Sequence, residues 1–86
     1  MKYSVEHIGT ILKNARLEKG LSQRALSVKS GVPQSHISKI ESGLVDLQTS
    51  SLIELSRVLD LELMLVPRTL VHTVHALQRG MKQKVS

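Results

Sequence analysis

The chain has 86 residues, which is enough for one domain with a small core. It contains no cysteine and Tyr3 is its only aromatic residue, so disulfides and thiolate chemistry are excluded and the core must consist of Leu, Ile and Val. No apolar stretch is long enough to span a bilayer and none resembles a signal peptide, so we expect a cytoplasmic protein with no membrane partner.

The formal net charge is +5, and it is unevenly distributed. Residues 1–45 carry seven Lys or Arg against three acidic residues, and residues 67–86 carry four basic residues and no acidic one. Residues 46–66 carry four acidic residues against one Arg. A basic N-terminal half suits a surface that meets phosphates, whereas the acidic middle argues against a protein that wraps nucleic acid on all sides.

The first predicted element is a helix over residues 5–19, ended by Gly20. Its apolar positions recur at helical spacing and are Ile8, Ile11, Leu12, Ala15 and Leu17. A second helix is predicted over residues 23–30, where Ser22 can cap the start. Its apolar face is expected to be Ala25, Leu26 and Val28. Gly31 then allows a turn, because glycine tolerates the left-handed conformation.

A third helix is predicted over residues 34–42. Pro33 suits its start, because proline has a preset backbone angle and no N–H group. Val32 is expected to fill the space between the two helices, and Ile37 and Ile40 to hold the third helix to the body. The other face is polar and consists of Gln34, Ser35, His36, Ser38 and Lys39. An ordinary pair of surface helices is the alternative, but cap, turn glycine, proline and polar helix together favour a helix-turn-helix.

A fourth helix is predicted over residues 50–59, with an apolar stripe of Leu52, Ile53, Leu55, Val58 and Leu59. The next run, residues 61–66, alternates like a β-strand and is ended by Pro67. Continuation of the helix is the alternative, because Leu, Glu and Met all favour helix. A lone strand cannot satisfy its own backbone, so we expect it to pair with the same strand of a second copy. The dimerisation residues would be Leu61, Leu63, Met64 and Leu65.

The segment 68–86 is a basic tail that can be helical from 70 to 78. Its apolar stripe is Leu70, Val71, Val74, Leu77 and Met81. It could dock a partner protein, cover the dimer sheet or fray. His72 and His75 share a helix face, but no third ligand is near, so we predict no metal site. No nucleophile triad, carboxylate pair or phosphate-cradling loop is present, and we therefore expect neither a cofactor nor an enzyme.

From Ile8 to Pro67 the chain resembles the Cro/CI-type (Xre) helix-turn-helix family. The resemblance depends on Gly20-Leu-Ser-Gln, Gly31-Val-Pro-Gln and Ile37-Ser-Lys-Ile-Glu-Ser-Gly. Within that family it resembles the HipB-like antitoxins, through Leu59-Asp-Leu-Glu-Leu-Met-Leu-Val-Pro. The resemblance implies a mainly α fold with a four- to five-helix DNA-binding domain over residues 1–67. It also implies a C-terminal β-strand that pairs across a homodimer.

The implied function is that of a sequence-specific repressor and antitoxin in a HipA-like toxin–antitoxin operon. Its partners would be double-stranded operator DNA with an inverted repeat, a second copy of the chain and a HipA-like kinase toxin. The alternative is a stand-alone phage-type repressor or operon controller without a toxin. A protein-only interaction module is a third class, and the polar face of the third helix argues against it.

The resemblance also implies site residues, with a DNA-binding set of Gln23, Gln34, Ser35, His36, Ser38 and Lys39. Gln23 falls where family members bond a phosphate or brace the recognition helix. Gln34 and Ser35 fall where members touch base edges, and a Gln amide can pair with adenine. Arg16 and Glu41 match a pair that ties the first helix to the end of the recognition helix, which is a structural role.

Overall fold

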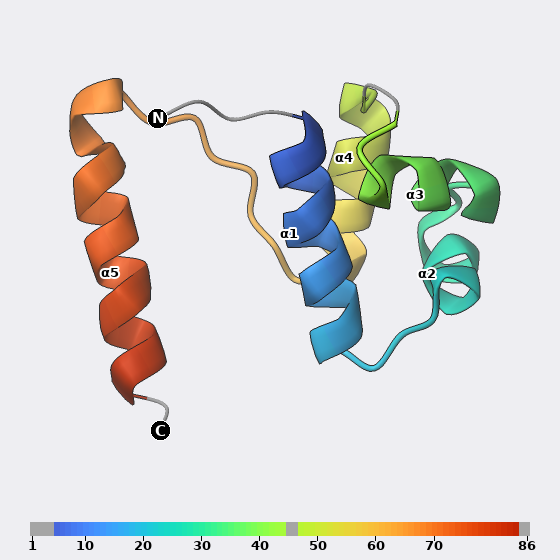
Figure 1. Ribbon diagram of the computed structural model, residues 1–86, viewed down its shortest axis with the longest axis horizontal. Helices are drawn as coiled ribbons and strands as arrows, with labels where there is room; N and C mark the ends of the chain where they lie inside the picture. The colour runs from blue at the N-terminus through green and yellow to red at the C-terminus, as the bar shows by residue number, and fades with distance from the viewer. Residues whose placement is uncertain (1–4, 45–46, 85–86) are drawn as a thin grey trace.

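The computed structural model describes residues 5–44 and 47–84, and five α-helices and one short 3₁₀-helix make up most of this part of the chain (Figure 1). The elements in order are α1 (Val5–Glu18), α2 (Gln23–Ser30), α3 (Gln34–Glu41), α4 (Thr49–Val58), η1 (Arg68–Leu70) and α5 (Val71–Lys84). The prediction of a mainly α fold with four to five helices is therefore confirmed.

Helices α1 to α4 form one body around a small aliphatic core. Helix α3 packs against α1 and α2, and α2 also packs against α4. The buried apolar side chains come from all four helices and the α2–α3 turn: Leu12, Leu26, Val32, Ile37, Ile40, Leu55 and Leu59. Burying each of them stabilises the fold by roughly 1.5–3 kcal/mol. The expected roles of Val32 and of the two isoleucines of α3 are thus confirmed.

Four residues of the predicted apolar faces do not lie in the core. Val28, Ile11, Leu17 and Ile53 are all exposed. Val28 lies two residues beyond Leu26, which places it about 200° around the helix from the buried face. Ile53 stands in the same relation to Leu55. The error arose because these helices carry more apolar residues than their single buried faces can accommodate.

The turn between α2 and α3 is fixed by local hydrogen bonds. The Oγ of Ser22 accepts a hydrogen bond from the backbone N–H of Ala25 at 3.0 Å, as expected for the N-cap. Gly31 has a φ of 79° and ends α2 in the left-handed conformation. The backbone N–H of Val32 donates to the Oγ of buried Ser30 at 3.2 Å, which satisfies a polar group inside the turn.

Gly9 sets the distance between α1 and α3, a role that was missed in the sequence. A Cβ atom placed on Gly9 would lie only 2.2 Å from the backbone oxygen of Ile40. Any larger residue would therefore push α1 away from the C-terminal end of α3. The signal that could have revealed this contact is a lone glycine in the interior of a helix, where glycine otherwise lowers stability.

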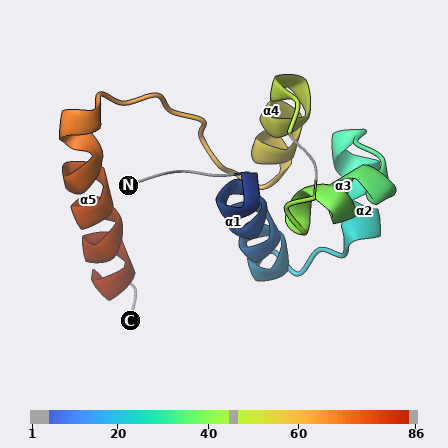
Figure 2. The same ribbon diagram turned by 45° about the horizontal axis from the view of Figure 1, so that its top comes forward.

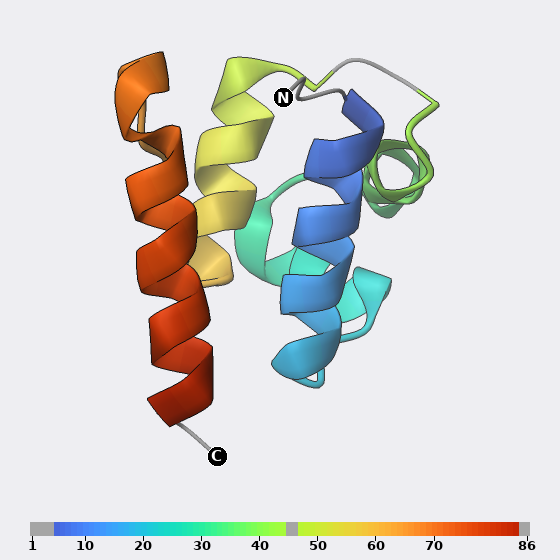
Figure 3. The same cartoon turned by 60° about the vertical axis from the view of Figure 1, so that its left-hand side comes forward.

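Leu61 still packs against the core, whereas residues 62–84, which we call the arm, leave the body and stand apart from it (Figures 1 and 2). Within this described part, residues 61–67 form no regular secondary structure, and α5 packs mainly against η1. Seen from the side, α5 runs roughly parallel to α1 and α4 (Figure 3). The predicted strand is not seen among the described residues and stays a prediction, whereas the C-terminal helix extends well beyond the predicted 70–78.

Candidate nucleic-acid interface

Helix α3 presents a polar face to solvent and an apolar face to the core. Ile37 and Ile40 are buried on the inner side. On the other side Gln34, Ser35, Ser38 and Lys39 are exposed and His36 is half-buried. All five residues belong to the DNA-binding set predicted from the sequence. They therefore share one short helix, which Ile37, Ile40 and Glu41 hold against the body.

A shallow groove of about 370 Å³ runs between α3 and the start of α4. It is lined by Pro33, Ser35, His36, Lys39, Gln48 and Ser51. Gln48 and Ser51 were missed in the sequence, although they belong to a polar run, residues 48–51, at the start of a helix. Hydroxyl, amide, imidazole and ammonium groups thus converge on one concave surface, a donor-rich arrangement suited to phosphate oxygens and base edges.

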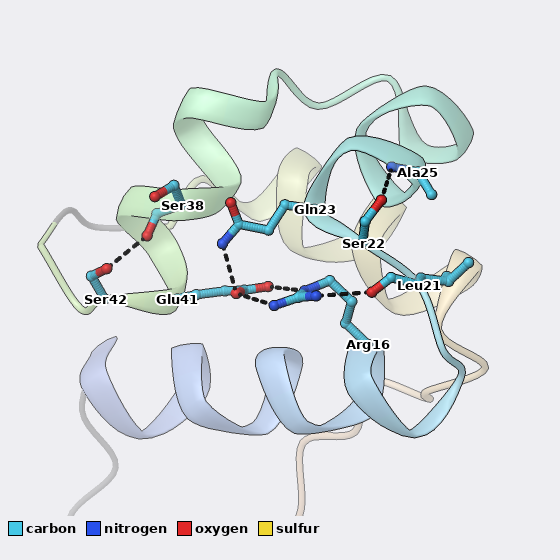
Figure 4. Close-up of polar contacts among 8 residues, drawn as sticks. All are labelled: Arg16, Leu21, Ser22, Gln23, Ala25, Ser38, Glu41 and Ser42. Atoms are coloured by element: carbon cyan, nitrogen blue, oxygen red, sulfur yellow. Dashed lines mark hydrogen bonds and ion pairs between the residues drawn. The ribbon is translucent and has the colours of Figure 1, made fainter.

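An ion pair links α1 to the end of α3 (Figure 4). The Nε of Arg16 donates to Oε2 of Glu41 at 2.8 Å, and its Nη2 donates to Oε1 at 3.0 Å. The Nη1 of Arg16 donates to the backbone oxygen of Leu21 at 2.8 Å. This two-pronged geometry fixes the relative orientation of the helices better than a single contact would.

The two charged groups of this pair are largely removed from water, since the side chains of Arg16 and Glu41 are 9% and 4% exposed. Burial raises the pKa of Glu41, but hydrogen bonds from Arg16 and Gln23 and nearby positive charge outweigh that effect and hold the pKa below its usual range. The hydrogen bond to Glu41 raises the pKa of Arg16 further above its usual value. Both groups therefore stay charged at neutral pH.

Gln23, the first residue of α2, joins the same network. Its Nε2 donates to Oε1 of Glu41 at 3.0 Å. The carboxylate of Glu41 thereby connects α1, α2 and α3 (Figure 4). Of the two roles implied for Gln23, the structure contains the brace. A phosphate contact by the same side chain stays a prediction.

The described part of the chain contains neither a metal-ligand cluster nor a membrane-spanning helix. Among these residues no group of three or more potential ligands could hold a metal ion. His72 is exposed on α5, and His75 is half-buried one turn later. None of the described helices has the length and hydropathy needed to cross a membrane.

The chain belongs to the helix-turn-helix family, whose sequence model matches residues 12–65. It is 45% identical over 74 residues to the uncharacterized HTH-type transcriptional regulator y4dL of Sinorhizobium fredii. That alignment covers 86% of this chain and 38% of y4dL, so the chain spans well under two thirds of that relative's length.

Two solved structures are similar to the fold. The restriction-modification controller protein C.AhdI from Aeromonas hydrophila superposes with a TM-score of 0.65 and 31% identity, covering 67% of this chain and 88% of the controller. HipB in complex with an O4 20mer superposes with a TM-score of 0.69 and 24% identity, covering 79% of this chain and 96% of that one. At 24% identity the second likeness shows the fold alone.

Proposed function

We propose that this chain is a sequence-specific DNA-binding transcriptional repressor that binds an inverted-repeat operator as a homodimer and has no catalytic activity of its own. The observation that carries the proposal is the polar face of α3, held outward by Ile37 and Ile40 and braced by the Arg16–Glu41 pair. The family assignment supports it, as does the similar fold of the restriction-modification controller protein C.Esp1396I, which was solved in complex with its operator.

In the proposed complex, α3 lies in the major groove. Gln34 and Ser35 read base edges, and Ser38 and Lys39 add base or phosphate contacts one turn later. The groove beside α4 takes the sugar–phosphate backbone, with His36 and Ser51 on either side. Two copies of α3 would bind successive major grooves roughly 34 Å apart, so the operator would contain half-sites one helical turn apart.

The base-reading role is tested by Gln34→Ala, measured on an operator selected from random duplexes and on an unrelated duplex. Losing a bidentate contact should cost about 1–3 kcal/mol on the operator and much less on unrelated DNA. Asn14→Ala is the control, because Asn14 carries an exposed amide on α1, outside both α3 and the arm. Equal losses on both duplexes would contradict base reading by Gln34.

The proposed dimer forms through residues 61–66. These residues form no regular secondary structure, and Leu63, Met64 and Leu65 are exposed. Antiparallel pairing with the same segment of a second copy would satisfy the backbone groups and cover these side chains. Leu63→Lys should therefore weaken dimerisation and operator binding together, as measured by sedimentation and by titration with DNA. An intact dimer of this variant would contradict pairing through the segment.

A HipA-like kinase toxin is the proposed protein partner, so the repressor would also be an antitoxin. The resemblance of residues 59–67 to HipB-like proteins supports this role, and one solved complex of the same fold contains HipA, HipB and DNA. An operon controller without a toxin is the second candidate, favoured by the higher identity to C.AhdI.

These two roles are distinguished by purifying the tagged chain from its native host and identifying bound proteins by mass spectrometry. A stoichiometric kinase-like protein, retained after nuclease treatment, is the result expected for an antitoxin. Recovery of the chain with operator DNA alone would favour the controller.

A further inference from the structure

The arm has an apolar face that the body of its own chain does not cover. Leu70 and Leu77 are seven residues apart, so they lie on the same side of the η1–α5 segment, and they are 48% and 64% exposed. Val74 lies between them at heptad-like spacing and is half-buried. Arg79 is two residues beyond Leu77 and thus lies around the other side of the helix. Over residues 70–79 the arm is therefore amphipathic, with Arg79 turned away from the leucines.

We propose that the apolar face of α5 packs on the body of the second copy in the dimer, at the joined ends of that copy's α1 and α4. The inference rests on the dimer proposed above. Antiparallel pairing of residues 61–66 about a two-fold axis puts the end of one segment opposite the start of the other. Arg68 of each copy then emerges beside Asp60 and Glu62 of the other, and not beside its own body.

Charge complementarity selects a second copy as the occupant of this face. Residues 67–86 carry four basic side chains and no acidic one, whereas residues 46–66 carry a net negative charge. Two α5 helices packed on each other would bring like charges together. Arg68, at the start of the arm, would instead lie beside Asp60 and Glu62 of the other copy, and these opposite charges favour this partner and this register.

The body has an exposed apolar side chain, Leu17, close to that place. Lys19 forms an ion pair with Asp60, which joins the C-terminal end of α1 to that of α4. Leu17, in the last turn of α1, is 55% exposed near this junction. Helix α5 has 14 residues and is about 21 Å long, so it can extend from the strand pair across the junction. The exposed leucines of α5 and Leu17 would then be buried together.

The absence of cysteine allows a direct test, because a single cysteine gives a single labelling site. A spin label is attached to Ala76→Cys, an exposed position away from the leucine face, in a chain without ¹⁵N. This chain is mixed with ¹⁵N-labelled wild-type protein that carries no spin label. Broadening of the ¹⁵N amide signals then reports contacts between copies only. We expect broadening at residues 17–19 and 59–61 of the ¹⁵N copy.

Sedimentation of the same mixture separates the two ways in which the test can fail. The mixture can be dimeric while the amides of residues 17–19 and 59–61 stay sharp, or while only the amides of α5 broaden. Either result overturns the placement of α5 and leaves the dimer intact. If the mixture is monomeric, the dimer of the proposed function fails, and the placement of α5 fails with it.

A matched pair of variants measures the contribution of this face. Leu77→Ala should weaken the dimer at least about tenfold, because each copy loses a buried leucine side chain. Its control, His72→Ala, lies on the same helix about 140° around from Leu77 and should leave the dimer unchanged. Alanine favours helix in both cases, so helix loss does not explain a difference. Equal dimer dissociation constants for the two variants would overturn the proposal.

Discussion

Leu26 and Leu65 have the same side chain but lie in two different regions of the molecule, the body and the arm. Leu26 is 1% exposed among the helices of the body, whereas Leu65 is 97% exposed in the arm. The body buries its leucines within one chain and is therefore stable through its own contacts. The arm leaves its leucines in water, where they stabilise nothing until another surface covers them. The body thus holds the recognition helix, and the arm is available for association.

The largest effect that would test this difference is expected for Leu26→Ala. It should destabilise the chain by about 2–5 kcal/mol, because it removes buried methyl groups and leaves a cavity. Leu65→Ala should change the free energy of unfolding by less than about 0.5 kcal/mol. Both are measured by denaturant unfolding at concentrations where the chain is monomeric. Comparable losses would show that the arm packs within its own chain.

A second large effect is expected for Gly9→Ala. The added Cβ would lie 2.2 Å from the backbone oxygen of Ile40, so α1 and α3 must separate. We expect a loss of about 1–3 kcal/mol in the same unfolding assay. Operator affinity should fall as well, because α1 braces the end of α3. Wild-type stability in this variant would show that α1 can shift without cost.

The contrast between body and arm also explains what could be predicted from the sequence. Helix α2 was placed correctly at residues 23–30, because Ser22 and Gly31 fix its ends through local bonds. The contact of Gly9 with Ile40 was missed, because it depends on how two helices approach each other. The groove residues Gln48 and Ser51 were missed for the same reason.

The segment at the start of the arm was harder to predict, because residues 61–66 alternate like a strand but form no regular secondary structure among the described residues. Alternation specifies which side chains share a face, but pairing needs a second chain. The Arg16–Glu41 ion pair was expected only through the family resemblance. Gln23 also bonds Glu41. Its role was left open between a brace for the recognition helix and a phosphate contact, because the glutamine side chain is long enough for either.

A smaller effect is expected for Glu41→Gln, which should lower stability by about 1–2 kcal/mol at neutral pH. The folded-state pKa of Glu41 is lowered, so its charge stabilises the fold fully above the usual glutamate pKa. This contribution disappears as the pH falls through the lowered value. The difference between wild type and variant should therefore shrink on acidification, as measured by unfolding at several pH values.

The control for that series is Glu54→Gln, which removes an exposed ion pair with Arg57 on α4. It should change stability by less than about 1 kcal/mol at any of these pH values. A constant difference between wild type and the Glu41 variant across the acid range would show that the carboxylate charge does not contribute to the stability of the brace.

The smallest effect is expected for Gly80→Ala, the counterpart of the Gly9 variant in the arm. A Cβ on Gly80 would meet nothing within 4 Å, so the substitution should only remove backbone freedom and favour α5 by up to about 1 kcal/mol. Hydrogen exchange should slow at the amides of α5 in the monomeric chain, while the unfolding midpoint of the body stays the same. A shifted midpoint would mean that arm and body unfold as one unit. Because α5 packs mainly against η1, we expect the two regions to unfold separately.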